Sequence, residues 1–152
     1  MTFGRFVGSW GMDVRFYDPD GEISIEGPAT WTFAWVLEGR AIQDVLVFGS
    51  PEDGTATSRG STMRYFDPRA GLWQVYWLGS LSGVIVRLHG KPSDGEILLE
   101  GEDADGSRVR WTFEDVTADS FHWRGVTSDD GGRSWHLEQE MLARRLTDGA
   151  PA

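Results

Sequence analysis

Cysteine is absent from this chain of 152 residues, and its absence removes several classes of protein at once. A disulfide framework, a thiolate metal site and a cysteine nucleophile are all excluded. No apolar run approaches the roughly 20 residues that a helix needs to span a bilayer. The opening segment, MTFGRFVGSW, lacks the basic and apolar regions of a signal peptide. We therefore expect a cytoplasmic protein.

Positive charge is also scarce. The chain has 14 Lys and Arg against 24 Asp and Glu, which gives a net charge of −10. Nucleic-acid binding draws its affinity from basic side chains that neutralise phosphates, and anionic membranes attract basic segments in the same way. The acidic balance therefore predicts neither a nucleic-acid partner nor a membrane partner.

What the chain has in quantity is turn signals. Clusters of Asp, Pro and Gly preset or tolerate the dihedral angles of turns. They occur as DPDG at 18–21, PEDG at 51–54, DPRAG at 67–71, PSDG at 92–95, DADG at 103–106 and DDGG at 129–132. The runs between them are rich in β-branched and aromatic residues, which suit strands. Short strands at such regular spacing indicate an all-β sandwich or barrel.

The pattern predicts about ten strands and one domain over residues 1–146, an antiparallel up-and-down β-barrel followed by a disordered tail at 147–152. A single helical turn fits residues 2–6. The expected strands lie near 7–17, 29–38, 40–49, 57–66, 72–79, 83–91, 96–102, 107–115, 119–128 and 133–145. The segment GSLSG at 79–83 is then a connection between two strands.

Alternation along each strand assigns one face to the barrel interior. The residues expected to point inward are Trp31, Phe33, Trp35, Leu37, Met63, Tyr65, Trp73, Val75, Trp77, Val109, Trp111, Phe113, Phe121, Trp123, Leu137, Gln139 and Met141. Opposite charges on the outer faces fix two registers, since a slip of one residue would invert both faces. One pairs Glu100 with Arg110 and Glu102 with Arg108, placing Val109 opposite Gly101. The other pairs Arg124 with Glu138 and His122 with Glu140, placing Phe121 opposite Met141.

The segment SDDGGRSW at 128–135 fits the Asp-box pattern Ser-x-Asp-x-Gly-x-Ser/Thr-Trp, a hairpin turn that recurs in sialidase-type propellers. Those propellers carry several copies over a longer chain, whereas this chain has one. We expect a turn between the last two strands and no glycosidase chemistry.

The segment FVGSWGMDV places Gly8-Ser9-Trp10 on the first strand, and this resembles the G-x-W signature of calycins, the group that holds lipocalins and fatty-acid-binding proteins. The resemblance implies that Trp10 closes one end of the barrel. It also implies that a basic residue of the last strand stacks over that ring. Arg145 fits this role by alternation, and Arg144 is the alternative.

Three longer stretches extend the resemblance. WTFAWVLEGRAIQDV, STMRYFDPRAGLWQVYW and SDDGGRSW, in this order, are similar to a bacterial family of calycin-like barrels of unknown function, over most of residues 5–145. The second and third lipocalin motifs are missing, so secretion and lipocalin-type transport are not carried over. The resemblance implies a fold and no activity.

Chemistry-bearing patterns are few. Three histidines, His89, His122 and His136, are not expected to converge on a metal, and only His89 comes into question as an inward haem ligand. The chain has no nucleophile elbow, phosphate-binding glycine loop or metal-binding helix motif. We expect no metal, no cofactor and no identifiable catalytic residue.

A polar pair interrupts the apolar third strand. In EGRAIQDV, residues 38–45, either Gln43 or Asp44 must point into the barrel, and a buried polar group needs a partner. Arg64, Arg87, Tyr65 or Gln139 could supply it. Two interpretations stay open: a satisfied internal network, or the polar end of a ligand pocket.

Eight tryptophans in so short a chain form the best case for binding. They either line a cavity for a small apolar or aromatic molecule or fill the interior themselves. The expected ligand-binding residues are Trp31, Trp35, Asp44, Tyr65, Trp73, Trp77, Trp111 and Trp123. Two alternatives remain: a packed barrel acting through its surface, for instance as a homodimer through Phe66, Leu72 and Tyr76, and an isomerase or hydrolase using the same pocket. Binding is favoured over catalysis.

Overall fold

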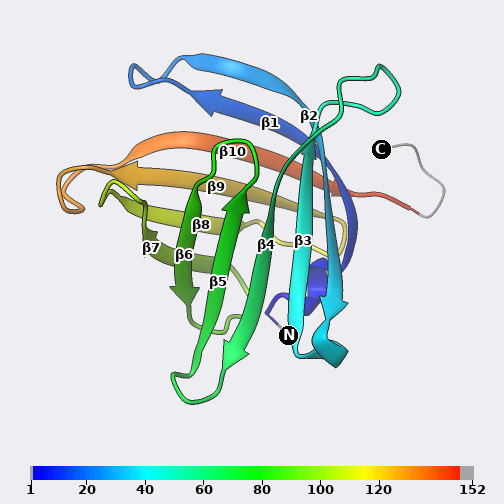
Figure 1. Cartoon of the computed structure of the whole chain (residues 1–152), viewed down its shortest axis with the longest axis vertical. Coiled ribbons are helices and arrows are strands. Elements are labelled where there is room, and N and C mark those ends of the chain that lie inside the picture. Colours follow the sequence, from blue (N-terminus) through cyan, green and yellow to red (C-terminus); the bar gives the residue numbers. More distant parts are fainter. Residues whose placement is uncertain (1, 148–152) are drawn as a thin grey trace.

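The strands follow the turn clusters along the chain and close into a ten-stranded antiparallel barrel (Figure 1). The computed structural model describes residues 2–147. The strands are β1 (Gly8–Tyr17), β2 (Ile23–Val36), β3 (Ala41–Phe48), β4 (Thr57–Asp67), β5 (Leu72–Gly79), β6 (Ile85–Gly90), β7 (Ile97–Glu102), β8 (Arg108–Glu114), β9 (Ser120–Ser128) and β10 (His136–Arg145). Each strand pairs with its neighbours in sequence, and β1 pairs with β10 to close the barrel.

The predicted architecture is confirmed. Two single turns of 3-10 helix accompany the strands, η1 (Gly4–Phe6), which matches the predicted helical turn, and η2 (Leu37–Gly39). The connection between β5 and β6 consists of residues 80–84, one residue later than predicted, because Gly79 is the last residue of β5. Of the tail predicted at 147–152, residues 148–152 lie outside the described part of the chain. Among residues 2–147, no helix combines the length and apolar character needed to cross a membrane.

Strand β2 begins six residues earlier than predicted, at Ile23 instead of position 29. The added segment contains Pro28, and proline cannot donate to a sheet ladder. The ladder between β2 and β3 begins only at Ala29, so Pro28 lies just beyond it and no donor is lost to β3. The added residues pair with β1 alone.

The two registers fixed by charge have different outcomes. Between β7 and β8 the prediction is confirmed in full, with Val109 opposite Gly101, Glu100 opposite Arg110 and Glu102 opposite Arg108. Between β9 and β10 the register is wrong by two residues, because Phe121 lies opposite Ala143. The predicted inward face is right for Gln139 and Met141 but wrong for Leu137, which lies opposite Val126 on the outer face. A bulge between Leu137 and Gln139 accounts for one residue of this shift, and the turn before it accounts for the other.

The predicted face of β4 is wrong. Four residues connect the paired positions Asp67 and Leu72, so Thr62, Arg64 and Phe66 oppose Trp77, Val75 and Trp73. Met63 and Tyr65 consequently lie on the outer face. The prediction preferred apolar side chains for the interior, whereas the fold buries Arg64 and supplies it with a carboxylate from β3.

The N-terminal segment closes one end of the barrel. Phe3 and Phe6 are buried inside it, and the Trp10 indole N–H donates to the Phe6 carbonyl at 2.8 Å. The Arg145 guanidinium lies 4.2 Å from the centre of the Trp10 ring, as the resemblance implied. Its three nitrogens donate to the backbone carbonyls of Ala118, Val7 and Arg5 at 2.7–2.9 Å. These contacts tie the last strand to the first and to the N-terminal plug, the segment that carries Phe3 and Phe6.

The Asp-box segment forms the turn between β9 and β10, as predicted. Asp130 accepts hydrogen bonds from the backbone N–H groups of Arg133 and Ser134, both at 2.9 Å, and from the hydroxyl of Ser128 at 2.8 Å. Hydrogen bonds from Ser134 and Ser128 lower the pKa of this carboxyl. Trp135 lies outside the barrel, where its ring stacks 4.2 Å from the Arg110 guanidinium.

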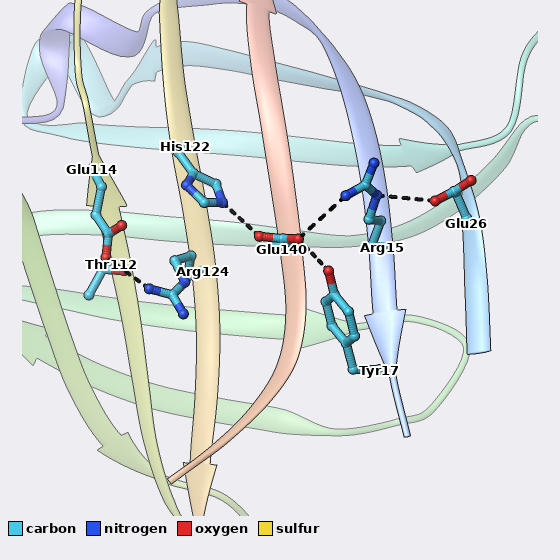
Figure 2. Close-up of polar contacts among 8 residues, drawn as sticks. All are labelled: Arg15, Tyr17, Glu26, Thr112, Glu114, His122, Arg124 and Glu140. Atoms are coloured by element: carbon cyan, nitrogen blue, oxygen red, sulfur yellow. Dashed lines mark hydrogen bonds and ion pairs between the residues drawn. The ribbon is translucent and has the colours of Figure 1, made fainter. Parts of the chain in front are cut away.

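A polar network crosses the outside of the seam where the barrel closes. Figure 2 shows Glu140 of β10 between Arg15 and Tyr17 of β1 and His122 of β9. Burial acts to raise the pKa of Glu140, but hydrogen bonds from Tyr17 and His122 outweigh it, and the net shift is downward. A carboxyl with a lowered pKa stabilises the fold above its unfolded value of about 4.3 and loses that contribution as the pH falls through the folded value.

Glu140→Gln is therefore expected to lower the free energy of unfolding by about 1–2 kcal/mol at pH 7 and by less below pH 4. Urea unfolding across this pH range measures the effect. Glu26→Gln is the matched control, since Glu26 contacts the same Arg15 at 3.1 Å but is mostly exposed. A loss that is equal for the two variants, or independent of pH, would contradict the role assigned to Glu140.

Candidate ligand-binding site

The barrel holds a cavity of about 270 Å³ at the end opposite the N-terminal plug. Strand β5 shows the two ends: Trp73 at its start contacts Phe3 of the plug at 5.0 Å between ring centres, while Gly79 at its end lines the cavity. In Figure 1 the N-terminal segment and the β5–β6 connection lie at opposite ends of the barrel. Leu81 and Ser82 of that connection border the cavity.

Four indoles from four different strands form the aromatic wall of the cavity. They are Trp31 of β2, Trp77 of β5, Trp111 of β8 and Trp123 of β9. Their ring centres follow one another at 6.3 Å from Trp77 to Trp111, 5.6 Å from Trp111 to Trp123 and 6.4 Å from Trp123 to Trp31. The interplanar angles of 59–84° are the tilted and edge-to-face geometries that aromatic pairs prefer.

Two glycines make room for these rings. A Cβ on Gly60 would lie 2.6 Å from the Trp77 ring, and a Cβ on Gly125 would lie 2.7 Å from the Trp123 ring. Each indole therefore lies over a strand position that has no side chain. The rest of the wall comes from apolar and small polar residues, among them Phe16, Leu46, Phe48, Thr62, Val86, Val109, Gln139 and Met141.

Charged groups gather among the cavity residues that belong to loops and strand ends. Arg59 lies beside Phe48, with its guanidinium 4.7 Å from the centre of that ring, and Asp103 and Glu138 contribute carboxyl groups. Burial raises the pKa of Glu138, and the negative charge of Asp103 adds to this effect. The cavity thus has an aromatic interior and a charged rim with two acids and one base.

A buried ion pair separates the cavity from the plug. The Asp44 carboxylate pairs with the Arg64 guanidinium and accepts a hydrogen bond from the Thr62 backbone N–H at 3.0 Å. Both side chains are fully buried. The Arg64 guanidinium lies 5.1 Å from the ring centres of Phe3 and Phe33. Asp44 is thus the inward residue of its pair and Arg64 its partner, whereas Gln43 lies on the outer side and donates to the Ser61 hydroxyl at 3.1 Å.

The structure brings together half of the predicted site residues. Trp31, Trp77, Trp111 and Trp123 line the cavity. Trp73 is buried against the plug, and Asp44 lies beneath the cavity wall without lining it. For Trp73 and Asp44 the predicted inward orientation is right, but the predicted position in the cavity wall is wrong.

The predicted cavity positions of Trp35 and Tyr65 are wrong. Trp35 belongs to the inward face of β2, but it lies next to the turn with η2 and is 42% exposed, and Leu37 beyond it is also exposed. Tyr65 is on the outer face, 38% exposed, with its ring stacked 6.5 Å from Tyr76. Alternation gives the face of a residue, but it does not say how far along the barrel the enclosed space reaches.

Sequence reasoning also missed Leu46, Phe48 and Thr62 in the wall. Leu46 and Phe48 share the face of Asp44 on β3 and could have been found by the same alternation. Thr62 required the correct face of β4. The histidines do not converge, and residues 2–147 contain no group of three or more His, Cys, Asp or Glu side chains arranged to hold a metal.

No protein-family model and no curated protein matches this sequence. The solved structure of the S-type phycobiliprotein lyase CPES from Guillardia theta is similar over 97% of this chain and 94% of that chain, with a TM-score of 0.67 and 14% sequence identity. This likeness confirms the barrel fold. It extends to the fold alone.

Two weaker likenesses have lower TM-scores. The match to a de novo designed fluorescence-activating β-barrel covers 94% of this chain and 95% of the designed chain, with 20% identity and a TM-score of 0.42. A protein of unknown function from the DUF3598 family of Nostoc punctiforme covers 95% and 97%, with 9% identity and a TM-score of 0.27. Membership of a particular calycin-like family stays a prediction.

Proposed function

We propose that this protein binds one flat, largely apolar small molecule in the barrel cavity. The observation that carries the proposal is the continuous wall of four indoles around about 270 Å³ of space. Ligand pockets are mostly apolar clefts of roughly 300–1,000 Å³ with a few polar groups, so this cavity suits a small ligand of that kind. Indole faces favour a planar ligand that stacks or meets them edge to face.

The cavity argues against a packed barrel that acts only through its surface, since that alternative requires the side chains to fill the interior. Of the residues expected on such a surface, Phe66 is exposed at the barrel end, while Leu72 and Tyr76 are only half-exposed. A homodimer stays a prediction that the proposal does not need.

Catalysis on the bound molecule is a second candidate, favoured by one residue. Glu138 lines the cavity and has a raised pKa, and a carboxyl of this kind in a cleft is a candidate proton donor or acceptor. Glu138→Gln would abolish turnover of a bound substrate while leaving its binding intact, which separates this candidate from simple binding.

Leu46→Trp is expected to block the cavity. Leu46 is a buried wall residue of β3, and an indole at this position would occupy much of the space. The fluorescent probe N-phenyl-1-naphthylamine should bind the wild-type protein with a rise in emission and should bind Leu46→Trp at least 10-fold more weakly. The titration uses direct excitation of the probe, so that the added tryptophan does not contribute.

Val45→Trp is the matched control. Val45 is the neighbouring residue of the same strand, and its side chain is exposed on the outer face. Its replacement should leave probe affinity within about twofold of wild type. Equal affinity of all three proteins would place the probe outside the cavity and would overturn the proposal, as would failure of the wild type to bind.

A further inference from the structure

Two of the cavity tryptophans have buried N–H groups without a hydrogen-bond partner in residues 2–147. They are Trp31, which is 3% exposed, and Trp123, which is 5% exposed. Their ring centres lie 6.4 Å apart, and both rings form part of the cavity wall. An indole N–H is a donor only, and leaving such a group unpaired away from water is unfavourable. As the rings lie in this structure, neither N–H has accessible surface, so a small turn of the indole is needed to offer either donor to an acceptor in the cavity.

The charge beneath this wall is already neutralised. Arg64 lies under the cavity, with its guanidinium 5.9 Å from the centre of the Trp31 ring. Its charge is balanced by Asp44, although its Nε and Nη2 groups have no hydrogen-bond partner among residues 2–147. The rings of Phe3, Phe33 and Trp31 lie against that guanidinium. A carboxylate ligand would have to be desolvated without gaining a free cation in return, and burying an unpaired charge is costly.

The charges at the rim also disfavour the binding of an anionic ligand. Two carboxyl groups, Asp103 and Glu138, line the cavity together with the single cation Arg59, and the chain carries a net charge of −10. The rim and the whole protein therefore repel negatively charged ligands or fail to attract them.

We propose that the ligand carries a neutral hydrogen-bond acceptor, such as a ketone or quinone oxygen, which enters the cavity and accepts from the indole N–H groups of Trp31 and Trp123. This inference rests on the proposed function and narrows it from a flat apolar molecule to a neutral aromatic carbonyl compound. Fatty-acid-like carboxylates and unsubstituted hydrocarbons are then poor ligands: the first bring an unpaired charge, and the second leave both donors unpaired.

Three probes of the same ring size test this inference: 2-acetylnaphthalene, 2-ethylnaphthalene and 2-naphthoate. Each competes with N-phenyl-1-naphthylamine at pH 7 on the full chain. The ketone should bind with at least 10-fold higher affinity than the carboxylate, as measured by displacement of the dye. The hydrocarbon is the more hydrophobic probe, so its affinity serves as the reference against which variants are compared.

Trp31→Phe and Trp123→Phe remove the donors one at a time and keep an aromatic ring in the wall. Each should lower the affinity of the ketone relative to that of the hydrocarbon by about 3–10-fold, the contribution of one hydrogen bond. Trp135→Phe is the control, because Trp135 lies outside the cavity. This variant should leave the ratio of ketone affinity to hydrocarbon affinity unchanged.

A second measurement needs no variant: the carbonyl stretching frequency of 13C-labelled 2-acetylnaphthalene should fall on binding to the wild type, relative to its value in an apolar solvent. The inference is overturned if the carboxylate binds most tightly, if both tryptophan variants keep the wild-type ratio, or if the carbonyl frequency stays at its apolar value. Those results leave the proposed function standing when the hydrocarbon still binds. Failure of the dye and of every probe to bind overturns both.

Discussion

Asp44→Ala is expected to lower the free energy of unfolding by about 3–5 kcal/mol, the cost of leaving a buried charge without its partner. Arg64 would stay fully buried between the cavity and the plug, with aromatic rings against its guanidinium and no counter-ion. The Thr62 backbone N–H would lose its acceptor as well. Chemical denaturation monitored by circular dichroism measures the loss.

The double variant Asp44→Ala/Arg64→Met provides the control. Replacement of a buried ion pair by apolar residues is often neutral or stabilising, so the double variant should recover most of the stability that the single variant loses. If the single variant stays within about 1 kcal/mol of wild type, or if the double variant is no better than the single, the pair does not have the role assigned to it.

Phe6→Ala is expected to cost about 3–5 kcal/mol, as large-to-small changes of buried aromatic residues do. Phe6 is 1% exposed and lies 4.9 Å from Phe113 and 5.0 Å from Phe121, measured between ring centres. Its removal would leave a hole in the plug that closes one end of the barrel. Thermal or chemical unfolding measures the loss.

Phe66→Ala is the matched control for the plug, because Phe66 is 41% exposed at the barrel end and should cost no more than about 1 kcal/mol. Since the cavity lies at the opposite end, Phe6→Ala should still bind N-phenyl-1-naphthylamine below its unfolding transition. A loss of stability no larger than that of Phe66→Ala, or a loss of probe binding in the folded variant, would contradict this division of the barrel into a plug and a cavity.

Local patterns predicted most of the fold. Turn clusters located most of the connections between strands, and the facing charges of Glu100 with Arg110 and Glu102 with Arg108 gave the β7–β8 register. The errors arose where local chemistry does not determine the outcome. The β9–β10 register moved by one residue at the turn and by one more at a bulge. The face of β4 depended on a buried arginine whose partner, Asp44, lies 20 residues away in the chain.

The site was less predictable than the fold. Composition and alternation identified Trp31, Trp77, Trp111 and Trp123 as interior residues, and these four do line the cavity. The same reasoning placed Trp73 beside them, although it packs against Phe3. The division between filled and open space depends on where the N-terminal segment folds back into the barrel, and strand patterns carry no information about that.

The interior of the barrel differs between its two ends. Phe3 and Phe6 fill one end, the Asp44–Arg64 pair lies above them, and the four indoles surround the open space beyond. Under the proposed function, ligand exchange takes place at the end that carries Arg59, Asp103 and Glu138. Changes at this rim should alter the rate of exchange, whereas changes in the plug should alter stability.

The most direct test of the account is a crystal structure of the protein with bound 2-acetylnaphthalene. The account predicts ring density inside the barrel, in contact with Trp77, Trp111 and Trp123, with the carbonyl oxygen within hydrogen-bond distance of the Trp31 or Trp123 indole nitrogen. Density for the probe only on the outer surface of the barrel, with the cavity closed or filled by water, would contradict it.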